Sequence, residues 1–249
     1  MNKIYIFFGL FLLASCAPNE VPSKDLVERD GIKYEVNSQT PFTGVSVEYY
    51  LDTMIKNEFE DRVLRKRTTF KKGIKNGLYE SYFENGQLSY KGNYKDGKRD
   101  GLQESYSKNG QLEFKVNFKD GVTFGLSEKY YDNGQLESRK NYKYVKEEGL
   151  QETYFENGQL EQRYTLKDGE IEGLYEKYFE NGQLDFKGNN KDGKLEGLWE
   201  SYQENGQLIS LRNFKDGLRD GLSEEYDNGQ VNKFCYKNNE QTDMSYCEK

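Results

Sequence analysis

A 24-residue period limits what this chain can fold into more than any other feature of its sequence. An Asn-Gly pair recurs at a spacing of 24 residues five times and then 23, and a Gly-Leu pair keeps the spacing of 24 throughout. Such self-similarity indicates stacked units, each of which buries its apolar surface only against its neighbours. The sequence therefore predicts seven units across residues 77–239. The Asn-Gly pairs begin at Asn85, Asn109, Asn133, Asn157, Asn181, Asn205 and Asn228, and the Gly-Leu pairs begin at Gly77, Gly101, Gly125, Gly149, Gly173, Gly197 and Gly221.

Each unit is predicted to be a β-hairpin. Two runs of about six to eight residues, rich in Tyr and Phe, flank each Asn-Gly pair, which is a strong hairpin signal. The segment from Asp96-Gly97 to Asp100-Gly101 is predicted to turn the chain into the next unit. No apolar period of 3.6 residues is sustained after residue 16. We therefore expect an all-β chain, an elongated antiparallel β-meander of stacked 24-residue hairpins.

Whether a residue has an even or an odd number predicts the face of the sheet to which its side chain points. Four even positions of each unit are mostly apolar and the odd positions are mostly polar, and side chains alternate between faces along a strand. A three-residue loop with a Gly bulge keeps the apolar rows together on one buried face, and we favour it. A two-residue turn would split those rows but would set Glu80 opposite Lys91, so this alternative stays open. The four even positions are those of Leu78, Tyr82, Leu88 and Tyr94.

The repeat unit resembles a known family. The stretch Tyr90-Lys-Gly92-Asn-Tyr94-Lys-Asp-Gly97 and the Gly at position 101 are similar to the Tyr-x-Gly-x-aromatic…Gly…Gly pattern of MORN repeats, specifically of the bacterial MORN-variant proteins. The resemblance covers about two-thirds of the chain and implies stacked hairpins. Several units depart from it at the position of Gly92. The residues there are Val116, Lys140, Tyr164 and Arg212.

The N-terminus predicts the cellular address. A short basic start with Lys3 precedes ten mostly apolar residues, Ile4–Leu13, which are too short to span a bilayer and typical of a signal segment. Leu13-Ala-Ser-Cys16 resembles the lipobox of bacterial lipoproteins, which implies cleavage before Cys16 and acylation of its sulfur. Ala17 after the acylated site favours the outer membrane by analogy with the usual sorting rule. The alternative is an ordinary secretory signal with an incidental cysteine.

Cys235 and Cys247, near the end of the chain, are predicted to form a disulfide that fastens the last edge of the sheet. Two free thiols remain an alternative, and a metal site lacks its usual companions because the chain has no histidine. On these grounds the chain is predicted to divide into five segments. They are a lipoprotein signal peptide at 1–15, a lipidated tether at 16–30, a degenerate N-terminal repeat or cap at 31–76, seven MORN-variant repeats at 77–239, and a C-terminal tail at 240–249.

Composition argues against several functions. The net charge is −7, whereas nucleic-acid binding needs a basic surface. Without histidine there is no His-based triad or His general base, and no phosphate loop, nucleophile elbow, cofactor motif or metal signature is present. We expect no enzyme, no catalytic residue and no cofactor. A column of glutamates, one in each unit, is interpreted as structural and in need of hydrogen-bond donors. Its members are Glu80, Glu104, Glu128, Glu152, Glu176, Glu200 and Glu224.

Aromatic residues at odd positions are the candidate partner-binding residues. An exposed aromatic stripe on a polar face is typical of a partner surface, although cross-strand packing would also explain it. We expect a non-enzymatic, lipid-anchored envelope scaffold that binds a protein or glycan. The alternative is an antitoxin or immunity role, which the resemblance implies because some MORN-variant proteins are named as antitoxins. The candidates are Tyr79, Phe83, Tyr131, Phe155, Tyr175, Phe179 and Trp199.

Overall fold

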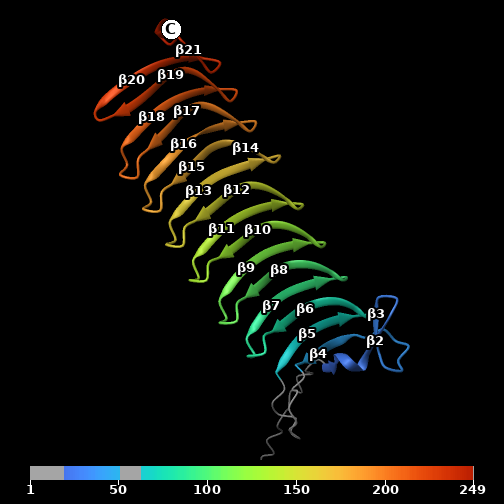
Figure 1. The fold of residues 1–249 in the computed structure, drawn as a ribbon. Helices are drawn as coiled ribbons and strands as arrows, with labels where there is room; N and C mark the ends of the chain where they lie inside the picture. Colours follow the sequence, from blue (N-terminus) through green and yellow to red (C-terminus); the bar gives the residue numbers. More distant parts are fainter. Residues whose placement is uncertain (1–19, 51–62, 249) are drawn as a thin grey trace, which may run out of the picture.

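A computed structural model describes residues 20–50 and 63–248 of the chain. The predicted signal peptide and the predicted lipidation site Cys16 lie outside these residues, as do the first four residues of the predicted tether, 16–19. Within the described residues, nineteen strands form one sheet, and the prediction of an all-β chain of consecutive hairpins is confirmed (Figure 1). No helix in this part of the chain is long and apolar enough to cross a membrane.

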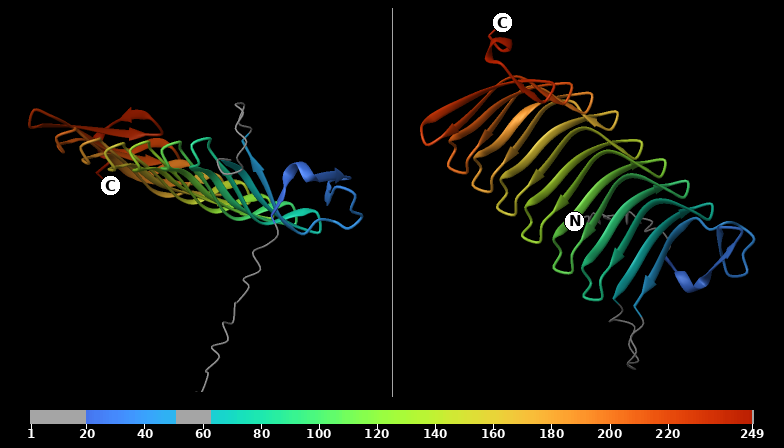
Figure 2. Two further views of the ribbon diagram at one scale, coloured as in Figure 1. Left: turned by 90° about the horizontal axis from the view of Figure 1, so that it is seen from below. Right: turned by 45° about the horizontal axis from the view of Figure 1, so that its top comes forward.

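The strands follow one another across the sheet in chain order. From β4 onwards the strands pair antiparallel in chain order, with β14 and β15 both pairing with β13, while the short β1 adds to β4 in parallel. Figure 2 shows the result as a long, twisted single layer with β2 and β3 beside its N-terminal end. The strands before the repeats are β1 (Glu20–Pro22), β2 (Leu26–Arg29), β3 (Ile32–Glu35), β4 (Gly44–Tyr49) and β5 (Leu64–Lys71).

Most of the repeat strands are 8 or 9 residues long. The repeat strands are β6 (Ile74–Tyr82), β7 (Leu88–Lys95), β8 (Lys98–Tyr106), β9 (Leu112–Lys119), β10 (Val122–Tyr130), β11 (Leu136–Lys143), β12 (Lys146–Tyr154), β13 (Leu160–Lys167), β14 (Glu170–Ile171), β15 (Gly173–Tyr178), β16 (Leu184–Lys191), β17 (Lys194–Tyr202), β18 (Leu208–Lys215), β19 (Leu218–Asp227), β20 (Gln230–Lys237) and β21 (Glu240–Thr242). Two short 3-10 helices, η1 (Ser23–Asp25) and η2 (Met244–Tyr246), lie near the ends.

Six of the seven Asn-Gly turns have the predicted three-residue loop. At the seventh the prediction is wrong: Asn228 and Gly229 form a two-residue turn, both with positive φ (49° and 80°), and Asp227 pairs with Gln230. Phe83 N–H donates to Gln87 O at 2.8 Å, and Gly86 N–H donates to Phe83 O at 2.9 Å. Of the Asn-Gly pair only the glycine, Gly86, takes a positive φ, of 81°. Asn85 serves differently: its side-chain oxygen accepts from Gln87 N–H, and its amide donates to the carbonyl of Lys108 in the next turn. The asparagine therefore links successive turns along one long edge of the sheet.

A bulge beyond each of the six three-residue loops overturns the prediction of a single apolar face. Tyr82 pairs with Leu88 as expected, but Ser89 is an extra residue, so that Ser81 pairs with Tyr90 and Glu80 with Lys91. An extra residue reverses which parity faces which side. Both alternatives are therefore realised in one hairpin, the three-residue loop near the turn and the charge pairing beyond it.

Two faces result, which we name by what they carry. The ladder face carries Leu78, Glu80 and Tyr82, paired with Asn93, Lys91 and Leu88, and their equivalents. The aromatic face carries Tyr79, Tyr90 and Tyr94 and their equivalents. Tyr94 thus lies on the face opposite Leu78, because it pairs with Gly77. The fully buried side chains include Gln103, Gln151, Ser210 and Ser223, all on the aromatic face.

The second turn of each unit is tighter than the first. Asp96 and Gly97 form a two-residue connection between β7 and β8, both with positive φ (48° and 82°), as this hairpin type requires. The turn ends there: Asp100 and Gly101 lie within β8, where the register shifts and Gly101 takes a φ of 91°. The predicted turning segment is therefore shorter than the sequence suggested, and its second half is a strand irregularity.

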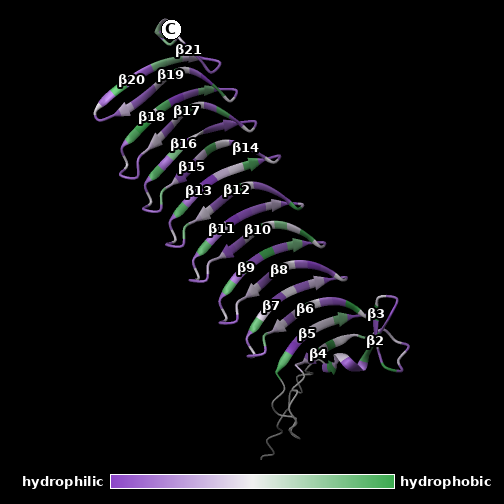
Figure 3. Ribbon diagram, in the orientation of Figure 1, coloured by the Kyte–Doolittle hydropathy of each residue, from purple (hydrophilic) through white to green (hydrophobic). Residues whose placement is uncertain are grey.

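Apolar burial is spread thinly along the sheet. The one cluster of buried hydrophobic residues in the described chain is Leu26, Phe42 and Phe70, at the N-terminal end. Elsewhere short hydrophobic segments recur on every strand without a continuous core (Figure 3). Each hairpin is therefore stabilised mainly by its two neighbours, as expected of a stacked array.

Candidate interaction surfaces

Five of the seven glutamates in the column on the ladder face pair with a lysine or arginine of their own sheet. Glu128, the most buried member, accepts from Lys115 Nζ at 2.5 Å, Arg139 Nε at 2.9 Å and Tyr130 Oη at 2.9 Å, and is 4% exposed. Burial opposes ionisation of this carboxyl, but the hydrogen bonds from Lys115 and Arg139 outweigh it and lower its pKa. The carboxylate is therefore held in its charged form at neutral pH.

The same arrangement recurs along the sheet. Tyr202 donates to Glu200, which raises the pKa of the Tyr202 hydroxyl to about 12. Since a cation, a tyrosine hydroxyl or both engage six of the seven carboxylates, the column acts as a structural ladder, as interpreted from the sequence. Further cation pairs are Arg139 with Glu152, Arg163 with Glu176, Lys187 with Glu200, and Lys233 with Glu224.

A row of leucines on the ladder face is exposed, contrary to the predicted burial. Leu102, Leu150, Leu174 and Leu198 are 37%, 41%, 46% and 41% exposed. Their strand neighbours are mostly asparagines, and Asn141 donates to the carbonyl of Leu150 at 2.7 Å. We call the leucines at this position the leucine row. Its members are Leu78, Leu102, Leu126, Leu150, Leu174, Leu198 and Leu222.

Three of the seven candidate aromatics lie on the aromatic face and pack against other rings. Tyr175 stacks on Tyr164 (centroids 5.6 Å apart, planes 19° apart) and on Phe186 (5.5 Å, 7°), and Phe186 stacks on Trp199 (5.9 Å, 30°). Tyr79 meets its neighbours edge-on. The flat faces of the stacked rings are turned toward one another, so these rings support the sheet.

Glycine at one position makes room for the stack. A Cβ on Gly188 would lie 2.1 Å from the Trp199 ring, so the indole lies directly over the Gly188 backbone. Its Nε1–H donates to the carbonyl of Asn189 at 3.0 Å. In the hairpin of Gly92 the Gln103 side chain fills the corresponding place, and it is almost fully buried. The Gly in the repeat pattern therefore accepts whichever large side chain the next strand supplies.

The other four candidates lie at the first residue of the Asn-Gly loops. Phe83, Tyr131, Phe155 and Phe179 each donate a backbone N–H to the glutamine that closes the loop. Tyr131 also reaches the next hairpin, where its hydroxyl donates to the carbonyl of Tyr154 at 2.8 Å. The predicted single stripe is therefore two separate groups, one on the aromatic face and one along the loop edge.

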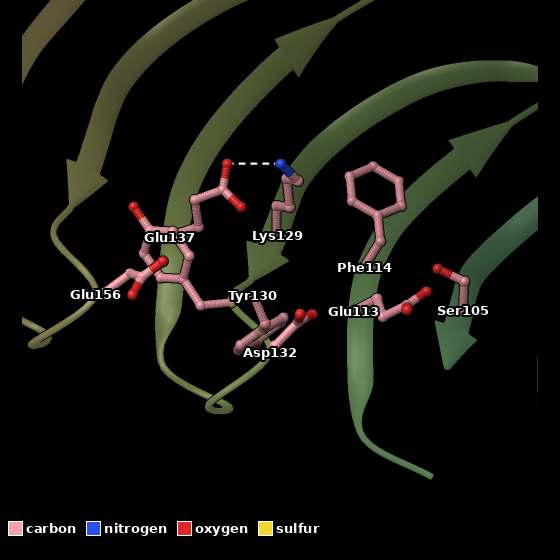
Figure 4. Close-up of a pocket in the computed structure, with 9 residues that line it drawn as sticks. Ser105, Glu113, Phe114, Lys129, Tyr130, Asp132, Glu137 and Glu156 are labelled. Carbon is pink, nitrogen blue, oxygen red and sulfur yellow. Dashed lines mark hydrogen bonds and ion pairs between the residues drawn. The ribbon is translucent and has the colours of Figure 1, made fainter. Parts of the chain in front are cut away.

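A pocket that the sequence did not indicate opens beside these loops. Its volume is about 590 Å³, and Figure 4 shows Phe114 and Tyr130 with the carboxylates of Glu113, Asp132 and Glu137 around it. The lining side chains come from three consecutive hairpins. Glu113 and Glu137 are the extra residues of their bulges. They line the pocket because the bulges shift the strand register, and even and odd residue numbers did not predict that shift.

The segments of the chain that match a known protein family correspond to its hairpins. The sequence pattern of the MORN repeat variant family matches six segments, which together cover more than half of the chain. The chain belongs to the MORN repeat variant family. No curated protein matches it significantly. The matched segments are residues 75–96, 99–120, 125–144, 147–168, 171–192 and 195–216.

The family matches coincide with the hairpins built around the Asn-Gly loops. Each of the six MORN segments contains one such loop and ends at the first residue of a two-residue turn. The seventh unit, in which Gly221 pairs with Tyr236, continues the same sheet past the last matched segment. The chain is thus a MORN repeat scaffold, whose repeated residues build the sheet and whose departures from the repeat give each region its own chemistry.

The C-terminal cysteines lie together at the end of this scaffold. Cys235, fully buried on β20, and Cys247, just after η2, form a disulfide with their Cα atoms 6.0 Å apart. Tyr246 of η2 also donates to Asp220 on β19. These bonds hold the C-terminal segment beside the last strands.

Proposed function

We propose that this MORN repeat protein is a lipid-anchored scaffold of the cell envelope that holds a protein partner along its ladder face. The observation that carries the proposal is the exposed leucine row. One leucine per hairpin stands at the same position, and four of them are more than a third exposed. Exposed apolar side chains bordered by polar ones are typical of a protein-binding surface.

The geometry of the row favours an extended partner. Leucines of successive hairpins are two strands apart, roughly 9.6 Å, so the row runs along the array. The glutamates and their cations border it, already paired within the sheet. A partner can therefore bury the leucines without leaving these charges unpaired, at ~1.5–3 kcal/mol for each leucine fully removed from water.

The glycan alternative has less support from the same surfaces. Sugar recognition by aromatic residues needs an exposed ring face, whereas the rings of Tyr175, Phe186 and Trp199 are stacked on one another. We therefore favour a protein as the partner.

The proposed anchor is supported by the sequence before the described residues. The basic start, the apolar run Ile4–Leu13 and Cys16 together resemble a lipoprotein signal. The Cys235–Cys247 disulfide fits an oxidising compartment outside the cytoplasm. Fractionation tests the anchor: the wild-type protein is expected in the membrane fraction and Cys16→Ser in the soluble fraction. Equal membrane association of both would refute it.

In-cell photocrosslinking tests the partner surface. A photoreactive residue at position 174, in the leucine row, is expected to capture one specific protein, and Leu174→Asp in the same chain is expected to abolish capture from a probe at 150. A probe at Lys215, exposed on the edge of the sheet, is the control. Equal capture from all three positions would refute the proposal. The antitoxin role predicts instead that the captured protein is a toxin whose activity this chain suppresses.

A further inference from the structure

One two-residue turn departs from all its repeat counterparts in composition. In three other hairpins a glutamate accepts the backbone N–H of the turn aspartate. Between β11 and β12 the turn is Tyr144-Val145 in place of Asp-Gly, and Phe124 stands where the carboxylate would be. Three linked changes thus replace a polar cap with an apolar cluster. The capped pairs are Asp168 with Glu148, Asp192 with Glu172, and Asp216 with Glu196, all at 2.9–3.0 Å.

This apolar cluster projects into solvent. Tyr144 and Val145 are 63% and 62% exposed, and Phe124 is 38% exposed and packs on the Tyr144 ring at 5.8 Å. Val145 takes a φ of 75°, a conformation that is strained for a β-branched residue. The fold thus keeps a strained, solvent-facing valine where other hairpins have glycine. We call Phe124, Tyr144 and Val145 the knob.

Lysines surround the knob. Lys143 and Lys146 flank the turn and are exposed, and Lys119 Nζ lies 5.6 Å from the centre of the Phe124 ring. The two carboxylates that follow the turn are already engaged: Glu147 pairs with Lys140 and Glu148 accepts from the Asp168 N–H. The knob is therefore an apolar projection with a basic rim.

The pocket lies at the opposite ends of the same strands, and its acidic rim is complementary to the basic rim of the knob. Phe124 lies near the start of β10 and Tyr130 at its end, while Lys143 ends β11 and Glu137 lies near its start. Aromatic rings line the pocket and carboxylates rim it, and its one lining lysine, Lys129, is paired with Glu137 at 2.6 Å. The unpaired rim charge is therefore negative. The other rim carboxylates are Glu113, Asp132 and Glu156.

We infer that the knob of one copy of this chain docks in the pocket of a second copy. The about 590 Å³ of the pocket accommodates a tyrosine side chain, and the basic rim of the knob meets the acidic rim of the pocket. A two-fold knob-to-knob contact would instead set lysines against lysines. Knob-to-pocket contact is heterologous and leaves a free knob and a free pocket at the two ends, so copies add side by side.

Cysteine crosslinking of the full chain in its native membrane tests this contact. Val145→Cys combined with Asp132→Cys, treated with a short bismaleimide, is expected to give a ladder of dimers and higher species. The control pairs Asp132→Cys with Lys191→Cys, an exposed position beside another two-residue turn, and is expected to stay monomeric. Equal ladders from both pairs, or no ladder from either, would overturn the inference.

Two further variants separate this contact from its alternatives. Val145→Cys alone is expected to give no crosslinked dimer, and a strong dimer from it would show a knob-to-knob contact instead. Lys143→Glu with Lys146→Glu is expected to reduce the ladder about tenfold, and adding Glu113→Lys and Glu156→Lys in the same chain is expected to restore it. Failure of this restoration, with the fold unchanged by circular dichroism, would also overturn the inference.

The inference does not rest on the proposed anchor or on the leucine row. The same crosslinking in a Cys16→Ser background is expected to give the ladder from solubilised protein. A ladder without membrane association would refute the anchor and leave the contact standing, whereas membrane association without a ladder would do the reverse.

Discussion

Replacing Glu128 with glutamine is expected to destabilise the sheet by about 2 kcal/mol. The substitution keeps the size of the side chain and removes one charge that two cations share, Lys115 at 2.5 Å and Arg139 at 2.9 Å. Removing one partner of a fully buried ion pair costs about 3–5 kcal/mol, whereas exposed pairs contribute ~0–1 kcal/mol. The two cations here are 33% and 42% exposed although the carboxylate is buried, which places the loss between these limits.

The loss depends on pH in a defined direction. The pKa of Glu128 is lower in the folded protein than the about 4.3 of an unfolded chain. Its ionised form therefore stabilises the fold above pH ~4.3, and this stabilisation disappears as the pH falls through the lower, folded-state pKa. The glutamine variant has no such titration. The difference between the two proteins is expected to be full at pH 7 and to close below pH ~4.

Urea denaturation followed by circular dichroism measures the difference, and hydrogen exchange of β9–β11 localises it, since repeat arrays open locally. Glu224→Gln serves as a graded control with a smaller expected loss, because Lys233 is its one paired cation. Equal unfolding midpoints for the wild type and Glu128→Gln at pH 7 would refute the reasoning. So would a difference of the same size at pH 3, since it could not arise from the carboxylate charge.

Three other substitutions test the turns and the aromatic face. Val145→Gly is expected to raise the free energy of unfolding by about 1 kcal/mol in urea denaturation, because glycine adopts a φ of 75° without strain. Gly188→Ala is expected to lower it by ~1–3 kcal/mol and to shift the emission of Trp199, the one tryptophan, because the new methyl overlaps the indole. Asn157→Asp is expected to cost about 1 kcal/mol in the same assay, because it loses the donor to the Glu180 carbonyl at 2.7 Å.

Matched variants control the first two. Gly169→Val reproduces the strain of Val145 at another two-residue turn, where Gly169 has a φ of 90°, and is expected to destabilise. Gly92→Ala would contact the flexible end of Gln103 rather than an indole ring, so a smaller loss is expected than for Gly188→Ala. If Gly169→Val were harmless, or if Gly92→Ala cost as much as Gly188→Ala, these explanations would be wrong.

The alternation of even and odd positions correctly predicted the pairing of Tyr82 with Leu88 next to the loop, but not the pairing beyond it. The three-residue loop was predictable because Asn-Gly and the apolar positions flanking it are local features, and local sequence selects the loop type. The extra residue Ser89 was not predictable, since its own identity varies from Ser to Glu, Asp and Ile among the units. That one residue moved Tyr94 away from Leu78 and exposed leucines that the sequence placed inside.

The sequence by itself determined the number of hairpins, the loop that closes six of the seven and the membership in a repeat family, because these depend on residues adjacent in the chain. Only the tertiary structure decided the surfaces. Glu128 meets two cations, Trp199 lies over Gly188, and Glu137 lines a pocket, because bulges set the register between strands. A periodic pattern can fix which residues recur, but which of them touch depends on the stacking of one hairpin on the next.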